Sequence, residues 1–147
     1  MSVAVAIVEE VARKLGGAAV LGAVVRSQAD LASAVRMRLP LAALDGLARA
    51  GLSPREIERF VIPERTRRHR AARHEKLTVE ESDRAVRLAR IQTLAEDTFE
   101  DRAKAARWLR RDLAALGGET PLAVAGTDAG ARLIEIMLAR IAWGAAA

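Results

Sequence analysis

Apolar residues recur every three or four positions along most of the chain, which is the spacing typical of amphipathic α-helices. No segment shows the strict alternation of apolar and polar residues that predicts a half-buried strand, and there is no internal repeat. The pattern therefore predicts an all-α fold. Helices are expected over residues 3–15, 27–37, 41–50, 54–61, 63–73, 78–97 and 102–111, with two more beginning near residues 120 and 128.

Capping residues and a proline mark where several of these helices begin. Ser53 and Glu56 have the spacing of a capping box, in which each side chain accepts a hydrogen bond from the other residue's backbone N–H. Thr78 and Glu81 repeat this spacing ahead of the long helix. The chain must turn before Pro63, because proline disfavours helical geometry in the residue that precedes it. We expect Pro63 to be the first residue of the next helix.

The N-terminal segment has the wrong pattern for a membrane anchor or a signal peptide. Residues 15–25 are apolar but too few for a membrane span, which needs about 20 residues. Glu9 and Glu10 interrupt the preceding apolar stretch, and no basic segment comes before it. Gly16 and Gly17 are expected to end the first helix. We therefore expect a cytoplasmic protein with no membrane partner.

Alanine dominates the apolar half of the composition. Hydrophobic residues make up 51% of the chain, with 32 Ala but only 2 Trp, 2 Phe and no Tyr. Such a chain favours thin, closely packed helices over sheets. The absence of cysteine excludes disulfides and thiolate zinc sites, and we expect neither a metal nor a cofactor.

Positive charge is concentrated in one predicted helix. The net charge is +5, and 21 of the 24 basic residues are Arg. A basic balance fits a polyanionic partner such as nucleic acid. The densest run lies in the helix expected over residues 63–73, which follows a short helix and a tight turn. These are the proportions of a helix-turn-helix.

This arginine-rich helix supplies candidate DNA contacts, because arginine can donate two hydrogen bonds at once to guanine or to phosphate. Thr66, Arg70 and Arg73 fall on one face and are the favoured contacts. His69 and His74 have no carboxylate at a ligand spacing, so they do not predict a metal site. A solvated charged face is the alternative. The candidate DNA-binding residues are Arg65, Thr66, Arg67, Arg68, Arg70 and Arg73.

The last helix carries more apolar surface than one small core can cover, which predicts a partner. Trp143 near its end suits an interface anchor, and residues 144–147 form a narrow tail that we expect to be flexible. An ordinary core with a homodimer face is the alternative. The apolar residues around the helix are Leu133, Ile134, Ile136, Met137, Leu138 and Ile141.

The sequence does not indicate an enzyme. It has no ordered Ser/His/Asp or Cys/His set and no glycine loop that could cradle a phosphate. The adjacent carboxylates at residues 80–81 and 96–97 lie at a helix start or in solvent-facing positions. A binding protein is therefore expected.

An ordered series of short motifs runs from residue 39 to residue 144. The motifs lie at residues 39–44, 52–56, 62–66, 77–84, 108–109 and 116–122, followed by Gly130, Leu138, Arg140, Ile141 and Gly144. The series resembles the MbcA/ParS/Xre family of bacterial type II antitoxins, whose partners are RES-domain toxins. The chain departs from the family pattern at four points. Arg67 stands where the family usually has leucine, and Trp143 stands where it favours tyrosine. The customary glycine before the Ile62–Pro63 turn and a proline often found in the region of residues 111–113 are both missing.

The resemblance implies an Xre-like helix-turn-helix bundle followed by a small helical toxin-binding domain. It divides the chain into an N-terminal helical arm (1–38), a helix-turn-helix domain (39–99) and a toxin-binding domain (100–147). It implies an antitoxin whose C-terminal region covers the active-site cleft of a NAD-degrading RES-domain toxin. The expected toxin-binding residues are Ile134, Met137, Leu138, Ile141, Trp143, Gly144 and Ala147.

The same resemblance implies autorepression of the operon through operator DNA, by a homodimer within a larger toxin–antitoxin complex. Two alternatives remain open. One is a stand-alone helix-turn-helix transcription regulator with no toxin partner. The other is a structural helical oligomer whose arginines are only solvated.

Overall fold

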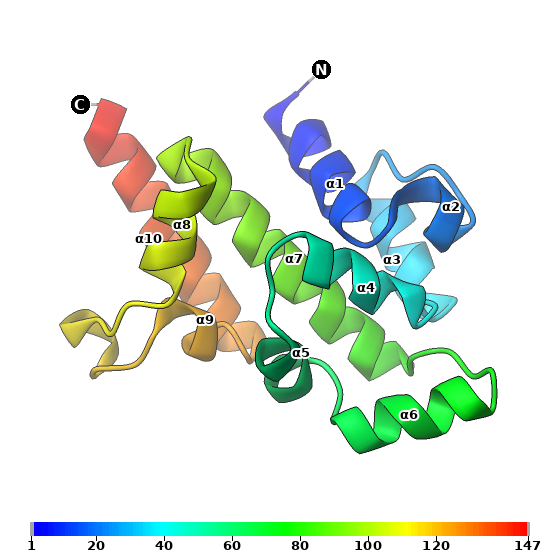
Figure 1. The fold of residues 1–147 in the computed structure, drawn as a ribbon. Helices are drawn as coiled ribbons and strands as arrows, with labels where there is room; N and C mark the ends of the chain where they lie inside the picture. Colours follow the sequence, from blue (N-terminus) through cyan, green and yellow to red (C-terminus); the bar gives the residue numbers. More distant parts are fainter. Residues whose placement is uncertain (1, 147) are drawn as a thin grey trace. The chain divides into compact units, whose positions relative to one another are not determined.

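A computed structural model describes residues 2–146, which form ten α-helices, one short 3-10 helix and no strand (Figure 1). The all-α prediction is confirmed. The chain divides into two compact units, the first ending at Ala89 and the second beginning at Arg90. This boundary lies inside the long helix α7 (Val79–Phe99), whereas the sequence placed a domain boundary at the end of that helix.

The described part of the first unit opens with a cluster of four helices. Gly16, with φ at +105°, ends the first of them as predicted. Gly17 then begins a five-residue helix that the sequence pattern did not predict, because two consecutive glycines read as a stop. The four helices are α1 (Val3–Lys14), α2 (Gly17–Leu21), α3 (Gln28–Arg36) and α4 (Ala42–Arg49).

α1 and α4 approach each other closely at Gly46. A Cβ atom at this position would lie 2.5 Å from the carbonyl oxygen of Lys14, so only glycine permits the contact. Leucines at helical spacing fill the space around the crossing. The core of the unit includes Val11, Leu15, Leu31, Leu39, Leu44, Leu47, Leu52, Ile57, Ile62 and Leu77.

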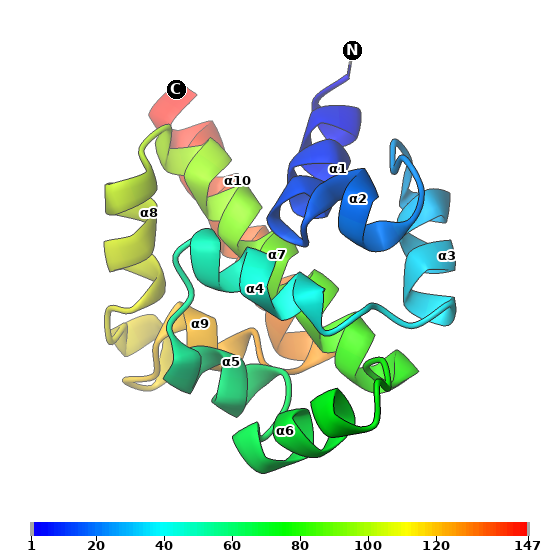
Figure 2. The same cartoon turned by 45° about the vertical axis from the view of Figure 1, so that its right-hand side comes forward.

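The predicted helix-turn-helix is formed by α5 (Pro54–Phe60) and α6 (Glu64–Ala72), which follow one another across a short turn (Figure 2). The predicted capping box is confirmed: the Glu56 N–H donates to Ser53 Oγ at 3.1 Å, and the Ser53 N–H donates to Glu56 Oε1 at 2.9 Å. Pro63 was expected to be the first helical residue, which is wrong. Its ψ of 141° makes it the N-cap, and α6 begins one residue later.

The start of α7 is fixed by a second capping box and by a buried hydrogen bond. The Glu81 N–H donates to Thr78 Oγ1 at 3.1 Å, and the Thr78 N–H donates to Glu81 Oε1 at 2.8 Å. The Leu39 N–H donates to the buried Ser82 Oγ at 2.9 Å. The Leu77 N–H donates to the carbonyl oxygen of Leu39 at 3.0 Å. These bonds tie the first turn of α7 to the segment that leads into α4.

In the second unit, α8 and α10 lie beside the second half of α7 (Figures 1 and 2). Their buried residues are small or branched, which suits closely packed helices. The core consists of Ile91, Ala95, Ala105, Leu109, Leu122, Ala131, Ile134 and Leu138. The elements after α7 are α8 (Arg102–Leu109), the 3-10 helix η1 (Ala114–Leu116), α9 (Pro121–Val124) and α10 (Asp128–Ala146).

Three residues separate the end of α9 from the start of α10, and glycine is required in the first turn of α10. The Gly130 N–H donates to Thr127 Oγ1 at 3.0 Å, which caps the helix. A Cβ on Gly130 would lie 1.7 Å from the carbonyl oxygen of Val124. The expected flexible tail is not observed in the described residues, because α10 continues through Ala146. Within residues 2–146, no helix combines the length and the apolarity that crossing a membrane requires.

Candidate functional site

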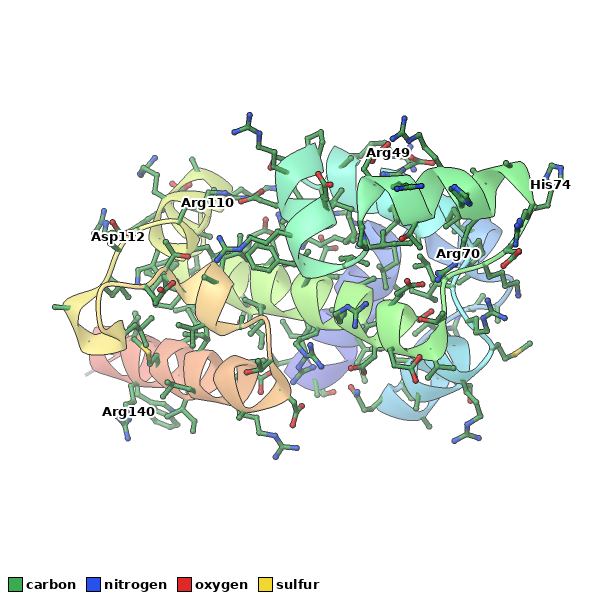
Figure 3. The ribbon with its side chains drawn as sticks, turned by 90° about the horizontal axis from the view of Figure 1, so that it is seen from below. Arg49, Arg70, His74, Arg110, Asp112 and Arg140 are labelled. Carbon is green, nitrogen blue, oxygen red and sulfur yellow. The ribbon has the colours of Figure 1, made fainter. Side chains whose placement is uncertain are left out.

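Helix α6 is held to the first unit by charge and not by an apolar face. None of its nine residues is buried. Arg67 donates to Asp45 Oδ1 on α4 at 2.9 Å. Arg70, which is labelled in Figure 3, forms an ion pair with Glu81 on α7. The second pair is the better shielded, since only 17% and 8% of its two side chains are exposed. Two of the predicted DNA contacts are therefore already engaged within the unit.

The opposite side of α6 presents exposed arginines. Arg65, Arg68, His69 and Arg73 line a shallow hollow in the surface. Among the described residues, the one ion pair in this row is a long one, in which the exposed Arg73 lies 4.0 Å from the carboxylate of Glu75. We call Arg65, Arg68, His69 and Arg73 the outer row of α6.

This geometry replaces the face that sequence reasoning favoured. Thr66 is half-buried and Arg70 is held by Glu81, so these two do not share a free face with Arg73. His69 belongs to the outer row because it is exposed on the solvent side of α6, one position after Arg68. The helical spacing of residues 65, 68, 69 and 73 was the signal that could have identified it.

The inner face of α10 packs into its own unit. Ile134 and Leu138, two expected toxin contacts, expose 0% and 2% of their surface. Glu135 lies on the neighbouring side, where its carboxylate accepts a 2.7 Å hydrogen bond from Arg90 Nε. Ile134 and Leu138 therefore belong to the core and cannot be surface contacts in this conformation.

The other face of α10 is apolar and exposed. Leu133 exposes 45% of its surface, Ile136 49% and Trp143 77%. Met137 and Ile141 are half-buried and Gly144 is exposed. Residues 133, 136, 137, 140 and 144 follow helical spacing, so their side chains lie along one stripe. We call Leu133, Ile136, Met137, Arg140, Trp143 and Gly144 the outer face of α10.

Three residues of this surface, Leu133, Ile136 and Arg140, were not among the expected contacts. Leu133 and Ile136 were recognised only as apolar positions, and their spacing relative to Met137 could have assigned them to the exposed stripe. Met137, Trp143 and Gly144 were expected and lie on it, and Ile141 lies at its edge. Ala147 lies outside the described residues.

The start of α8, in the same unit, is fixed electrostatically. The Lys104 N–H donates to Asp101 Oδ1 at 3.0 Å, capping the helix. This backbone hydrogen bond lowers the pKa of Asp101 below its ordinary value of 3.8. The ring of Trp108 lies 5.6 Å from that of Phe99, which joins α8 to the end of α7.

Comparison with known proteins divides the chain in a similar way. Residues 30–90 match the antitoxin Xre-like helix-turn-helix domain. Residues 94–144 match the antitoxin Xre/MbcA/ParS C-terminal toxin-binding domain. The outer row of α6 lies in the first match, and the outer face of α10 lies in the second.

Two curated proteins are similar to the chain over part of their length. A protein of Pseudomonas putida named Antitoxin Xre is 41% identical over 96 residues, covering 65% of this chain and 60% of that protein. A protein of Photorhabdus laumondii with the same name is 37% identical over 70 residues, covering 47% of each. The similarity thus spans about half to three fifths of these relatives.

Proposed function

This chain belongs to the Xre/MbcA/ParS antitoxin family, and we propose that it neutralises a NAD-degrading RES-domain toxin. In this proposal, the outer face of α10 covers the active-site cleft of the toxin. The outer row of α6 binds operator DNA, so that a homodimer within the toxin–antitoxin complex represses its own operon.

The observation that carries the proposal is the apolar outer face of α10. Leu133, Ile136 and Trp143 are large, exposed and on the same side of one helix, within the domain matched as toxin-binding. Contiguous apolar surface of this kind marks an interaction site. Burying one large apolar side chain contributes about 1.5–3 kcal/mol, so covering these three supplies an interface core. Tryptophan is also enriched among the residues that contribute most binding energy.

The DNA-binding part rests on the outer row of α6. A short helix after a tight turn is the element that enters the major groove in helix-turn-helix proteins. Here the same helix carries arginines on its solvent side, where they are free to contact phosphates and guanine. Arg67 and Arg70 are assigned to seating the helix and not to contacting DNA.

Co-expression with a RES-domain protein encoded beside this chain tests the toxin proposal. The toxin alone should arrest growth, and the wild-type chain should restore it. Leu133→Asp together with Ile136→Asp should fail to restore growth, because two charges would have to be buried in the interface. Val3→Asp is the control for an added carboxylate, since it replaces an apolar side chain that is 70% exposed in the other unit.

The outcome also separates toxin neutralisation from DNA binding. Neutralisation by the double variant would overturn the assignment of the outer face of α10. Failure of the wild-type chain to neutralise, together with sequence-selective binding of promoter DNA, would favour the stand-alone transcription regulator.

A further inference from the structure

Arg140 lies in the middle of the outer face of α10. The residues one helical turn away on either side are Ile136, Met137, Trp143 and Gly144, and none of them carries a charge. The Arg140 side chain is exposed and points away from the ribbon of α10 (Figure 3). A single positive charge therefore stands within an apolar surface.

No carboxylate of the described residues pairs with Arg140. The acidic residues along α10 have other partners: Asp128 accepts from Arg132 at 3.3 Å, and Glu135 accepts from Arg90 at 2.7 Å. Arg140 has no acidic residue at a spacing of three or four. Within residues 2–146, only solvent faces its charge.

Covering the outer face removes that solvent. Arginine stays protonated under all ordinary conditions, so the charge cannot be relieved by losing a proton. A buried charge without a partner is strongly unfavourable, whereas a hydrogen-bonded charge pair is tolerated. The covering surface must therefore supply a negative group opposite Arg140.

Gly144 provides room for such a group. It lies one turn after Arg140, and a Cβ placed on it would have no atom within 4 Å. A partner side chain can therefore reach the guanidinium group along the surface of α10. A carboxylate fits best, because the guanidinium group can donate two parallel hydrogen bonds to it.

We infer that the toxin surface covering α10 presents a carboxylate to Arg140, and that this ion pair is the polar determinant of partner specificity in an otherwise apolar interface. This inference rests on the proposed function, and it adds a chemical requirement on the partner. A related toxin without an acidic residue at this point would be rejected, because Arg140 would be buried unpaired.

Surface plasmon resonance against the immobilised RES-domain protein tests the inference. Arg140→Met keeps the length of the side chain and removes its charge. Its dissociation constant should rise at least about thirtyfold, because the toxin carboxylate is then left buried alone. The salt dependence of the association rate should also weaken. Arg140→Lys should give an intermediate loss, since lysine cannot form the two-point contact.

The control is Arg36→Met, an exposed arginine in the first unit, which should change the dissociation constant less than about twofold. A toxin in which lysine replaces this carboxylate should bind Arg140→Glu, and it should bind the wild-type chain only weakly. Binding of Arg140→Met with wild-type affinity would overturn the inference.

Leu133→Asp tests the interface separately from the ion pair. If it abolishes binding while Arg140→Met does not, the interface stands and only the ion pair is wrong. If both variants bind with wild-type affinity, the interface and the ion pair are both overturned.

Discussion

Arg70 of α6 and Glu81 of α7 form an ion pair from which solvent is largely excluded. The same Glu81 carboxylate accepts the N–H of Thr78 at 2.8 Å, so it also closes the N-terminus of α7. Because α6 buries no residue, this pair and the Arg67–Asp45 pair take the place of the apolar face that normally seats such a helix. The position of the candidate DNA-binding helix therefore depends on Glu81.

Glu81→Ala should lower the free energy of unfolding by about 2–4 kcal/mol, because it removes a helix cap and leaves the guanidinium group of Arg70 shielded without a partner. Urea unfolding followed by circular dichroism measures this loss. Asp83→Ala is the control, since Asp83 lies two positions later and its carboxylate, which pairs with Arg87, is more than half exposed. Its cost should be below about 1 kcal/mol. Equal costs for the two variants would contradict the role assigned to Glu81.

Local signals allowed most helix starts to be predicted from the sequence. Ser53 and Glu56 form the expected capping box, because the box depends only on residues within one turn. α2 was missed because its opening Gly17 is a helix breaker by propensity and tertiary packing decides its conformation. Pro63 was misplaced by one residue, since proline suits both the cap and the first helical position.

The surfaces were predicted less well than the helices. The sequence showed that α10 has too much apolar surface, but which of its faces is buried depends on the rest of the unit. Ile134 and Leu138 were therefore assigned to the partner although they lie in the core. Arg70 was assigned to DNA because its partner Glu81 is distant in sequence and belongs to another helix. The periodicity of the sequence does not show which helices contact one another, so it could not predict these contacts.

Arg65→Ala and Arg68→Ala should weaken binding of operator DNA without changing thermal stability, because both side chains lie on the free side of α6. Fluorescence anisotropy at several salt concentrations measures the effect. Each arginine that contacts a phosphate should reduce the slope of log K against log salt by about 0.9. Arg70→Ala, in contrast, should lower the melting temperature. Unchanged DNA affinity in both outer-row variants would remove α6 from the DNA interface.

Gly130→Ala should destabilise the second unit by about 3 kcal/mol, since its Cβ would collide with the carbonyl oxygen of Val124. Thermal unfolding measures the change. Gly144→Ala is the matched control in the same helix, where a Cβ meets nothing within 4 Å and alanine favours the helix by about 1 kcal/mol. A fall in stability for Gly144→Ala as large as that for Gly130→Ala would refute the steric explanation.

The stability contributed by the Asp101 carboxylate should depend on pH. Its pKa is lowered in the folded chain because the Lys104 N–H donates to it. The contribution is therefore present above the pKa that Asp101 has in the unfolded chain. It is lost as the pH falls through the pKa that Asp101 has in the folded chain. Melting temperatures of the wild-type chain and of Asp101→Asn should converge between neutral pH and the acid range. A constant difference across that range would exclude this linkage.

The central claim is that a toxin covers the outer face of α10, and Trp143 reports on it directly. The chain contains 2 Trp, so labelling with 5-fluorotryptophan gives one signal from Trp143 and one from the half-buried Trp108. Trp143→Phe assigns the signals. Fluorine NMR in H2O and in D2O, with and without the unlabelled RES-domain protein, measures how far each ring contacts solvent. The account predicts that the solvent isotope shift of Trp143 is large in the free chain and disappears in the complex, while that of Trp108 hardly changes. A Trp143 signal that keeps its full solvent shift in a saturated complex would contradict it.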